Sequence, residues 1–288
     1  MPQPGEDLRG YVIERTLGRG GSATVYLARR PQDSRPVALK VLDPRHRDSE
    51  ARHRLERAFV LTGQLDHPHI VTEYELGPHW IAMQYVDGGN IATLTATADR
   101  LIALAQIADA LDHAHRMGIV HCDVKPANIL VHQDFSAGGA VLIDFAVAHV
   151  PAEDMAARLA RAGGVRLSLD PARRLTRRPP AAPPTVQASL PYAAPEMLLG
   201  RMPSASTDQY SLACTAVELL TGAPPFTAST AAGLIDAHLE QPPPRFSQRM
   251  AGLPRGIDAV LTTALMKEPD ARHESCAEFV DLLQRVLN

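Results

Sequence analysis

Three lysines stand out in a chain that carries most of its positive charge on arginine. Of the 29 basic residues, only Lys40, Lys125 and Lys267 are lysine. Lys40 ends the apolar run VALK, and Lys125 lies inside HCDVKPANIL. Lysine presents a compact ammonium and arginine a planar fork, so the two are not interchangeable where a phosphate is held. Lysine at these first two positions therefore indicates phosphoryl-transfer chemistry.

The segment HCDVKPANIL groups three side chains that such a transfer needs. Asp123 and Asn128 lie five residues apart, with Lys125 between them. A carboxylate beside the attacking hydroxyl orients or accepts its proton, an ammonium stabilises the moving phosphoryl group, and an amide oxygen can hold Mg²⁺. A second carboxylate, Asp144, ends the apolar run VLI, where a buried strand would deliver an oxygen ligand for Mg²⁺. Taken alone, Asp144 is equally typical of a turn.

A glycine-rich segment, GRGGSATVY, precedes VALK and lies between two strand-like runs. Gly18 and Gly20 would let the backbone approach a phosphate closely, because neither has a Cβ atom. A third glycine of such a loop would fall at Ala23. By itself the segment is more typical of a structural turn, and Lys40 of a strand-end lysine lying on apolar surface. Their order along the chain favours phosphate binding.

Strands are predicted over most of residues 11–86. The runs YVIERTLG, ATVYLARR, PVALKVL, IVTEYEL and WIAMQYV alternate or are continuously apolar, which predicts five strands. One helix is predicted between the third and fourth strands, beginning at Asp48 or Ser49. Farther along, the chain is mainly helical, and two apolar helical patterns end at Gly118 and Gly222, as is typical of helix C-termini.

Composition argues against several classes of protein. The net charge of −3 gives no reason to expect nucleic acid or a membrane surface as a partner, and no run of about 18 apolar residues predicts a membrane span. The cysteines Cys122, Cys214 and Cys276 show neither zinc nor disulfide spacing, which fits a reducing, cytoplasmic setting. The N-terminal residues show no signal-peptide pattern.

In this order, the motifs resemble those of protein kinases, specifically the eukaryotic-like Ser/Thr protein kinases of bacteria. GRGGSATV, VALK, HCDVKPANIL and DFA are similar to the family's Gly-rich loop, strand lysine, catalytic loop and Asp-Phe motif. PYAAPE is similar to the Ala-Pro-Glu that closes the activation segment, and KEPDAR to the family's final motif. The resemblance runs from about Tyr11 to Leu287, and the lysine two residues after Asp123 marks the Ser/Thr branch.

The resemblance implies an α+β fold of two lobes within a single kinase domain, residues 1–288. The N-lobe, residues 11–86, would hold a five-stranded antiparallel sheet and one helix. The C-lobe, residues 87–288, would be mainly helical, with ATP in the cleft between the lobes. Glu196 of PYAAPE would pair with Arg272 of KEPDAR.

The same resemblance implies a role for each residue of the site. Lys40 would contact the α- and β-phosphates of ATP, Asp123 would be the catalytic base, and Lys125 would stabilise the transferred phosphoryl group. Asn128 and Asp144 would hold Mg²⁺. The nucleotide would contact the Gly-rich loop, the two sides of the adenine pocket, a gatekeeper and the hinge, formed by Gly18, Gly20, Gly21, Ser22, Val25, Ala38, Leu130, Met83, Gln84 and Val86.

The activation segment would run over residues 144–196, with an Arg- and Pro-rich insert at 151–188. The insert is more typical of a solvated loop than of a docking site for an acidic or phosphorylated regulatory partner. Ser189 falls where the family keeps a Thr that contacts both the catalytic aspartate and the catalytic lysine. Candidate autophosphorylation sites in the insert are Ser168, Thr176 and Thr185.

Three positions depart from the family's pattern. Ala58 stands where the family has a helix glutamate, so Lys40 would lack its usual partner unless a bulge or register shift brings Glu56 to it. Cys122 replaces the arginine that receives the phosphate of a phosphorylated activation loop, so any activity is expected to be independent of that phosphorylation. Ala146 replaces a glycine, and where that residue needs φ > 0, alanine costs roughly 1 kcal/mol.

Two alternatives to an active protein Ser/Thr kinase using ATP and Mg²⁺ remain open. A pseudokinase that binds ATP or acts as a scaffold is suggested by the three departures, although Lys40, Asp123, Asn128 and Asp144 are all present. A small-molecule phosphotransferase on a related fold is disfavoured by PYAAPE, since that segment is built to hold a peptide. The expected partner is therefore a protein substrate with a Ser or Thr acceptor.

Overall fold

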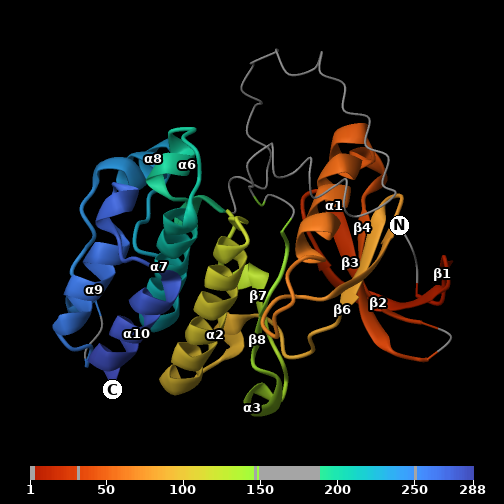
Figure 1. Cartoon of the computed structure of the whole chain (residues 1–288), viewed down its shortest axis with the longest axis horizontal. Helices are drawn as coiled ribbons and strands as arrows, with labels where there is room; N and C mark the ends of the chain where they lie inside the picture. The colour runs from red at the N-terminus through yellow and green to blue at the C-terminus, as the bar shows by residue number, and fades with distance from the viewer. Residues whose placement is uncertain (1–3, 31–32, 146–147, 149–188, 250–251) are drawn as a thin grey trace.

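The N-terminal part of the chain folds as an antiparallel sheet with one helix packed against it (Figure 1). The computed structural model describes residues 4–30, 33–145, 148, 189–249 and 252–288. The strands lie in the order β1-β2-β3-β4-β6-β5. Their bounds are β1 Asp7–Leu8, β2 Tyr11–Arg19, β3 Ala23–Arg29, β4 Pro36–Leu42, β5 Glu73–Gly77 and β6 Trp80–Gln84.

The five predicted strands are confirmed, and β1 adds a sixth of two residues. Leu8 of β1 pairs with Tyr11 of β2, a pairing too short to leave a pattern in the sequence. The fourth predicted strand begins at Glu73, three residues later than Ile70. Ile70 instead bridges Leu142 in the helical lobe, so this stretch joins the two lobes rather than extending the sheet.

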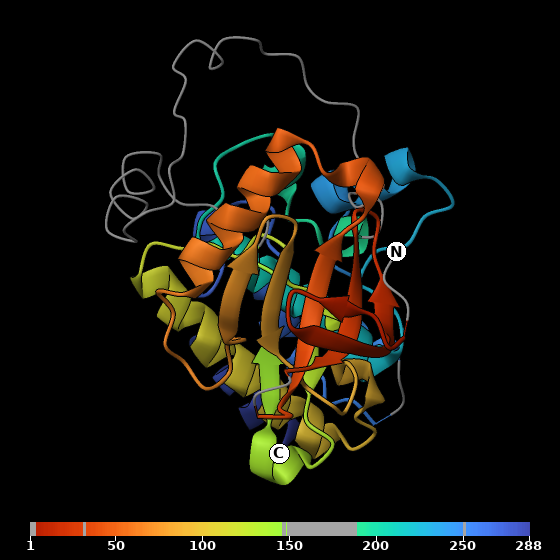
Figure 2. The ribbon, with the colours of Figure 1, turned by 90° about the vertical axis from the view of Figure 1, so that its right-hand side faces the viewer.

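The helix of the N-lobe, α1 (Ser49–Thr62), begins where the sequence predicts. The Asp48 carboxylate accepts a hydrogen bond from the Ala51 N–H at 2.7 Å and so caps the first turn. Leu55 lies in one apolar cluster with Ile81 of β6 and Val141, which joins α1 to both the sheet and the start of the helical lobe. Figure 2 shows α1 lying across the sheet.

The second lobe is mainly helical, as predicted (Figure 1). Its helices are α2 Thr97–Arg116, α3 Phe135–Gly138, α6 Pro195–Leu198, α7 Ala205–Thr221, α8 Ala231–Glu240, α9 Gly256–Ala264 and α10 Cys276–Leu287. A two-stranded sheet, β7 Ile129–Val131 and β8 Ala140–Leu142, faces the N-lobe. Short 3₁₀ turns span Pro44–His46, Ile91–Thr93, Pro126–Asn128, Leu190–Tyr192, Phe246–Gln248 and Pro269–Ala271.

The core of this lobe is built around α7, which is buried along almost its whole length between Thr207 and Leu220. The helix ends at Gly222 in the left-handed conformation (φ 81), as the apolar run followed by glycine predicts. Helices α2 and α10 pack beside it in one continuous apolar cluster. In the part of the chain that the structure describes, no helix is both long and apolar enough to cross a bilayer.

Candidate active site

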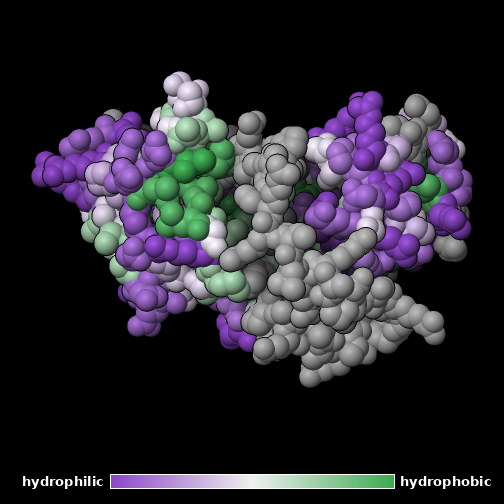
Figure 3. Space-filling view, turned by 90° about the horizontal axis from the view of Figure 1, so that it is seen from above, coloured by the Kyte–Doolittle hydropathy of each residue, from purple (hydrophilic) through white to green (hydrophobic). Residues whose placement is uncertain are grey.

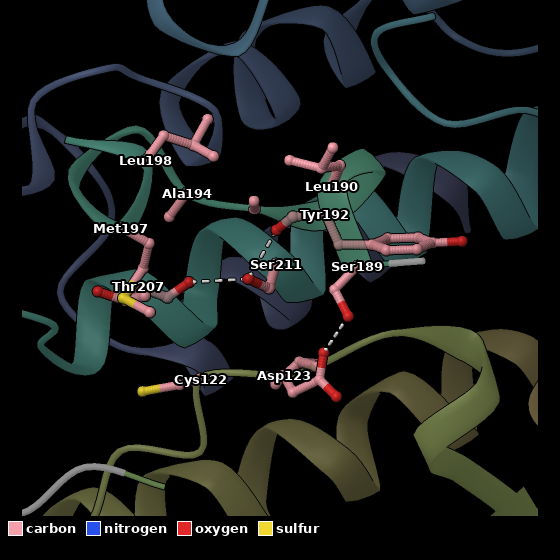
Figure 4. A pocket seen from close by; sticks show the side chains of 12 residues that line it. Cys122, Asp123, Ser189, Leu190, Tyr192, Ala194, Met197, Leu198, Thr207 and Ser211 are labelled. Carbon is pink, nitrogen blue, oxygen red and sulfur yellow. Dashed lines mark hydrogen bonds between the residues drawn. The ribbon is translucent and has the colours of Figure 1, made fainter. Parts of the chain in front are cut away.

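Three polar side chains of the loop before β7 and one from a distant segment, Ser189, form a closed hydrogen-bonded group. Lys125 Nζ donates to the two carboxylate oxygens of Asp123, at 2.9 and 2.7 Å. Ser189 Oγ donates to Asp123 Oδ1 at 2.7 Å and accepts from Lys125 Nζ at 2.8 Å. Asn128 Nδ2 donates to Asp123 Oδ2 at 2.9 Å. The predicted contacts of Ser189 with the aspartate and the lysine are therefore confirmed, and Figure 4 shows its bond to Asp123.

The backbone of this loop is held by Asp208, a fully buried residue in the first turn of α7. The N–H groups of His121 and Cys122 each donate to its carboxylate at 2.8 Å. Cys122 has a φ of 67, a left-handed conformation that is uncommon outside glycine. Two short bonds to one buried carboxylate hold the loop in this bend. Asp208 was not identified from the sequence. The available signal was an aspartate at the start of the mostly apolar run DQYSLACTAVELL.

A second pair of charges joins the two lobes. Lys40 Nζ, from β4, donates to Asp144 Oδ1 at 2.8 Å, and both side chains are partly buried. Asp144 follows β8 with a φ of 70, so the chain turns sharply at the carboxylate. Phe145, next in the chain, is buried with its ring edge-on to His121, 4.7 Å between centroids. Lys40, the predicted strand lysine, and Asp144, a predicted metal ligand, therefore form an ion pair in this structure.

Of the two alternatives for Glu56, the register shift that would bring it to Lys40 does not occur. Glu56 Oε1 accepts a hydrogen bond from Arg52 Nε at 2.9 Å, one turn earlier on α1. Ala58 lies on the helix face that lines a small cavity with Lys40 and brings no charge there. A carboxylate of β5, Glu73, lines the same cavity and was not identified from the sequence.

The residues predicted to surround adenine come together in one apolar cluster. Ala38, Met83 and Val86 are buried members, and Val25 and Leu130 pack against them from β3 and β7. Ala38 of β4 lies opposite Met83 of β6. Gln84 ends β6, and its N–H donates to the Thr72 carbonyl at 2.8 Å.

The Gly-rich segment forms the turn between β2 and β3. Gly18 lies opposite Val25, and Gly20 N–H donates to the Ala23 carbonyl at 2.8 Å. Gly21 and Ser22 complete the turn, whose Ser22 carbonyl accepts from Asp43 N–H at 2.9 Å. A Cβ atom built on Gly18 would meet nothing within 4 Å, so the backbone faces open space at this residue. Binding of phosphate there stays a prediction.

The ion pair predicted between Glu196 and Arg272 is confirmed. The guanidinium donates to both carboxylate oxygens, at 2.9 and 2.8 Å, and both side chains are almost fully buried. The pair ties the segment after Ser189 to the end of the helical lobe. Ala146 and the insert at 151–188 lie outside the described residues, as do the candidate phosphorylation sites in the insert.

Lys267, the third lysine of the chain, packs within the helical lobe. Lys267 Nζ donates to the carbonyls of Ala237 and His238 in the last turn of α8, at 3.3 and 2.7 Å. It also lies over the ring of Phe226, 4.2 Å from the centroid. A cation at the C-terminus of a helix stabilises its unpaired carbonyls, so Lys267 belongs to the packing of the helical lobe.

Comparison with known proteins shows the family of the chain. A model of the protein kinase domain matches residues 11–287. The chain is 40% identical over 291 residues to the serine/threonine-protein kinase PknJ of Mycobacterium tuberculosis, covering 96% of this chain and 45% of PknJ. It is 36% identical over 295 residues to the serine/threonine-protein kinase PknF of the same organism, covering 97% of this chain and 56% of PknF. The chain therefore spans about half the length of these curated relatives.

A solved structure shares the fold over the whole length. The crystal structure of the Mycobacterium tuberculosis PknI kinase domain superposes with a TM-score of 0.70 at 30% sequence identity, covering 99% of both chains. The superposed region takes in the sheet, the helical lobe and the site between them. By sequence and by architecture alike, this chain belongs to the protein kinase family, and within it to the bacterial Ser/Thr kinases that resemble the eukaryotic ones.

Proposed function

We propose that this chain is an active protein Ser/Thr kinase that transfers the γ-phosphate of ATP to a Ser or Thr hydroxyl of a protein. The observation that carries the proposal is the closed group of Asp123, Lys125, Ser189 and Asn128, together with the Lys40–Asp144 pair. Phosphoryl transfer requires mainly positioning and charge stabilisation, and these side chains supply both.

Each member of the group has one task in the proposed reaction. Asp123 is about one-fifth exposed and orients the acceptor hydroxyl. Lys125 donates to that carboxylate and stabilises charge on the phosphoryl group as it moves. Lys40 holds the phosphates that stay with the nucleotide. The adenine lies among the apolar side chains of the cluster around Ala38 and Met83.

Asn128 and Asp144 are proposed to hold the Mg²⁺ that accompanies ATP. Both offer oxygen ligands, which hard divalent cations prefer. The amide nitrogen of Asn128 donates to Asp123, which directs the amide oxygen away from that carboxylate and leaves it suited to a cation. When bound, the ion would neutralise charge on the phosphates.

A cavity beside Asp123 supports a protein as the acceptor. It has a volume of about 320 Å³ and is lined by residues between 189 and 198 and by Thr207 and Ser211 of α7 (Figure 4). Leu190, Met197 and Leu198 make its wall largely apolar. Figure 3 shows an apolar patch on this lobe over the region of α6 and α8. We propose that an apolar side chain of the substrate fills the cavity, while the acceptor hydroxyl of the substrate's Ser or Thr contacts Asp123.

The first test is phosphate transfer from γ-labelled ATP by the purified chain with Mg²⁺ and a general protein acceptor. We expect incorporation by the wild type and a loss of at least about a thousandfold in Asp123→Asn, which keeps the shape of the side chain but removes its charge. ATP binding without incorporation in either protein would instead favour the pseudokinase. Omitting Mg²⁺ tests the proposed metal.

Three finer expectations are part of the proposal. The insert at 151–188 would be the contact site of a regulatory partner. The chain would act in the cytoplasm, without nucleic acid as a partner. Because Cys122 replaces an arginine, activity would not depend on phosphorylation of the activation segment. A strong gain of activity after treatment with a second kinase would contradict this last expectation.

A further inference from the structure

A small cavity lies between the N-lobe sheet and α1, behind the predicted nucleotide site. Its volume is about 80 Å³, and Lys40, Ala58, Glu73, Met83 and Asp144 all contribute to its wall. It therefore contains one cation and two carboxylates within an otherwise apolar lining. The Lys40–Asp144 ion pair accounts for two of these three charges.

A bulge in β5 turns Glu73 into this cavity. In a regular strand, residues two apart share a face, so Glu73 and Glu75 would point the same way. The register shifts between them, because Glu73 lies opposite Met83 while Glu75 lies opposite Ala82. Glu75 consequently accepts a hydrogen bond from the Tyr11 hydroxyl at 2.7 Å, in the separate apolar cluster of Tyr11 and Trp80. Glu73 faces the opposite side of the sheet.

The carboxylate of Glu73 has a buried oxygen that lacks a partner. Among the described residues, Oε2 is inaccessible to solvent and accepts no hydrogen bond. Burial raises the pKa of Glu73 to about 7, and the positive charge that acts against this rise is Lys40. Buried polar atoms in folded proteins are almost always satisfied, because an unpaired one is costly. A state of the protein in which Glu73 is paired is therefore expected.

Lys40 is the group able to pair with it. In the present state Lys40 donates to Asp144, the residue proposed to hold Mg²⁺. A cation on Asp144 competes with Lys40 for the same carboxylate oxygens. The helix offers Lys40 no replacement, since Ala58 is uncharged and Glu56 is engaged with Arg52.

We propose that Glu73 is the carboxylate that positions Lys40 on the nucleotide phosphates once Asp144 has turned to the metal ion. The inference rests on the proposed function, because it assigns Lys40 and Asp144 to ATP and Mg²⁺. Glu73 is a positioning residue in this account, acting on the substrate only through the ammonium of Lys40. It takes the place that a glutamate at position 58 would fill from the helix.

The first experiment compares Glu73→Gln with Glu75→Gln in phosphate transfer. The two variants make the same change on the same strand, but on opposite faces of the sheet. We expect Glu73→Gln to lower kcat/KM for ATP at least tenfold, and Glu75→Gln to change it less than about twofold. The double variant Ala58→Glu/Glu73→Gln returns a carboxylate to the cavity from α1 and is expected to recover a large part of the loss. Wild-type activity in Glu73→Gln would overturn the proposal.

A binding experiment separates positioning from a merely structural role and does not need catalysis. The affinity for Mg²⁺-ATP is measured calorimetrically in four proteins: wild type, Glu73→Gln, Lys40→Met and the double variant Lys40→Met/Glu73→Gln. We expect Glu73→Gln to weaken binding about tenfold when Lys40 is present and less than about twofold when it is Met. An equal loss in both backgrounds would overturn the proposal, because Glu73 would then act independently of Lys40. A wild type that binds ATP but transfers no phosphate would refute the proposed function while leaving this comparison valid.

Discussion

At the scale of single residues, the site depends on hydrogen bonds that fix the distance between opposite charges. The Ser189 hydroxyl donates to Asp123 and accepts from Lys125, so one oxygen atom sets the position of both. The same carboxylate is held from another side by Asn128. Hydrogen bonds to charged groups contribute about 1.5–3 kcal/mol each, more than those between neutral groups. The geometry of the Asp123–Lys125 pair is therefore sensitive to one hydroxyl.

Replacement of Ser189 tests this sensitivity. We expect Ser189→Ala to lower kcat about tenfold, because Lys125 still reaches Asp123 directly but neither is held by the hydroxyl. Ser189→Thr keeps the hydroxyl and is expected to retain kcat within about threefold. Steady-state kinetics at saturating ATP measure both variants. Equal rates for Ala and Thr would show that the hydroxyl does not position the pair.

At the scale of secondary structure, Arg57 joins α1 to the chain just after Phe145. Arg57 Nη2 donates to the Ala148 carbonyl at 2.9 Å. Burial lowers the pKa of Arg57, and its Nε has no hydrogen-bond partner among the described residues. A half-buried guanidinium with one strong contact joins the helix that lines the Lys40 cavity to the chain just beyond Asp144.

Loss of this contact should loosen α1. We expect Arg57→Ala to increase amide hydrogen exchange in residues 49–62 at least threefold, since a charged donor to a carbonyl contributes about 1.5–3 kcal/mol. Arg54→Ala is the matched control, because Arg54 lies on the same helix three residues before Arg57. Arg54 forms an exposed ion pair with Glu50, and such pairs contribute little to stability. Exchange mass spectrometry compares the two. Equal exchange in both variants would show that Arg57 does not anchor the helix.

Secondary structure also shows where prediction from sequence succeeds and where it ends. The start of α1 was predictable, because the Asp48 cap is a local feature of neighbouring residues. Asp123, Lys125 and Asn128 were predictable because one short loop carries all three. Glu73 was not, since the bulge that turns it inward depends on pairing between β5 and β6 rather than on β5 alone.

At the scale of the whole molecule, one buried network of charges connects the catalytic loop with three helices. The Nε2 atom of His115, in α2, lies 2.8 Å from Asp208 Oδ2 of α7, and its Nδ1 atom lies 3.6 Å from Asp112 Oδ1. Asp112 in turn accepts from the N–H groups of Cys276 and Ala277 at the start of α10, at 3.1 and 2.9 Å. Since Asp208 also holds the catalytic loop, the charge of His115 bears on the stability of the helical lobe and of the loop together.

The network predicts a dependence of stability on pH. Burial lowers the pKa of His115, but the hydrogen bonds and charges of Asp112 and Asp208 outweigh it and raise the value to about 9. The protonated imidazole is therefore favoured by folding. Its contribution, about 3 kcal/mol, is complete below pH of about 6.5 and is lost as pH rises through 9.

Urea unfolding of wild type and His115→Gln between pH 6 and 10 tests the prediction. We expect the difference in free energy of unfolding between the two proteins to be largest at pH 6 and to shrink by about 3 kcal/mol by pH 10. Taking the difference cancels other groups that titrate in this range, such as Lys267, whose pKa burial lowers to about 8. A constant difference across the range would show that His115 is not held in its charged form.

The position of Glu73 on β5 has a consequence for how the proposed activity could be controlled. Glu73 and Lys40 belong to the same sheet, joined through β6, and so move together as one body. A carboxylate carried by α1 could be withdrawn by rotating the helix, and activity would then follow the position of that helix. If Glu73 pairs with Lys40 as proposed, a signal that displaces α1 would leave the lysine paired. Under the same proposal, control of activity would act on Asp144 or on access of the substrate rather than on the position of α1.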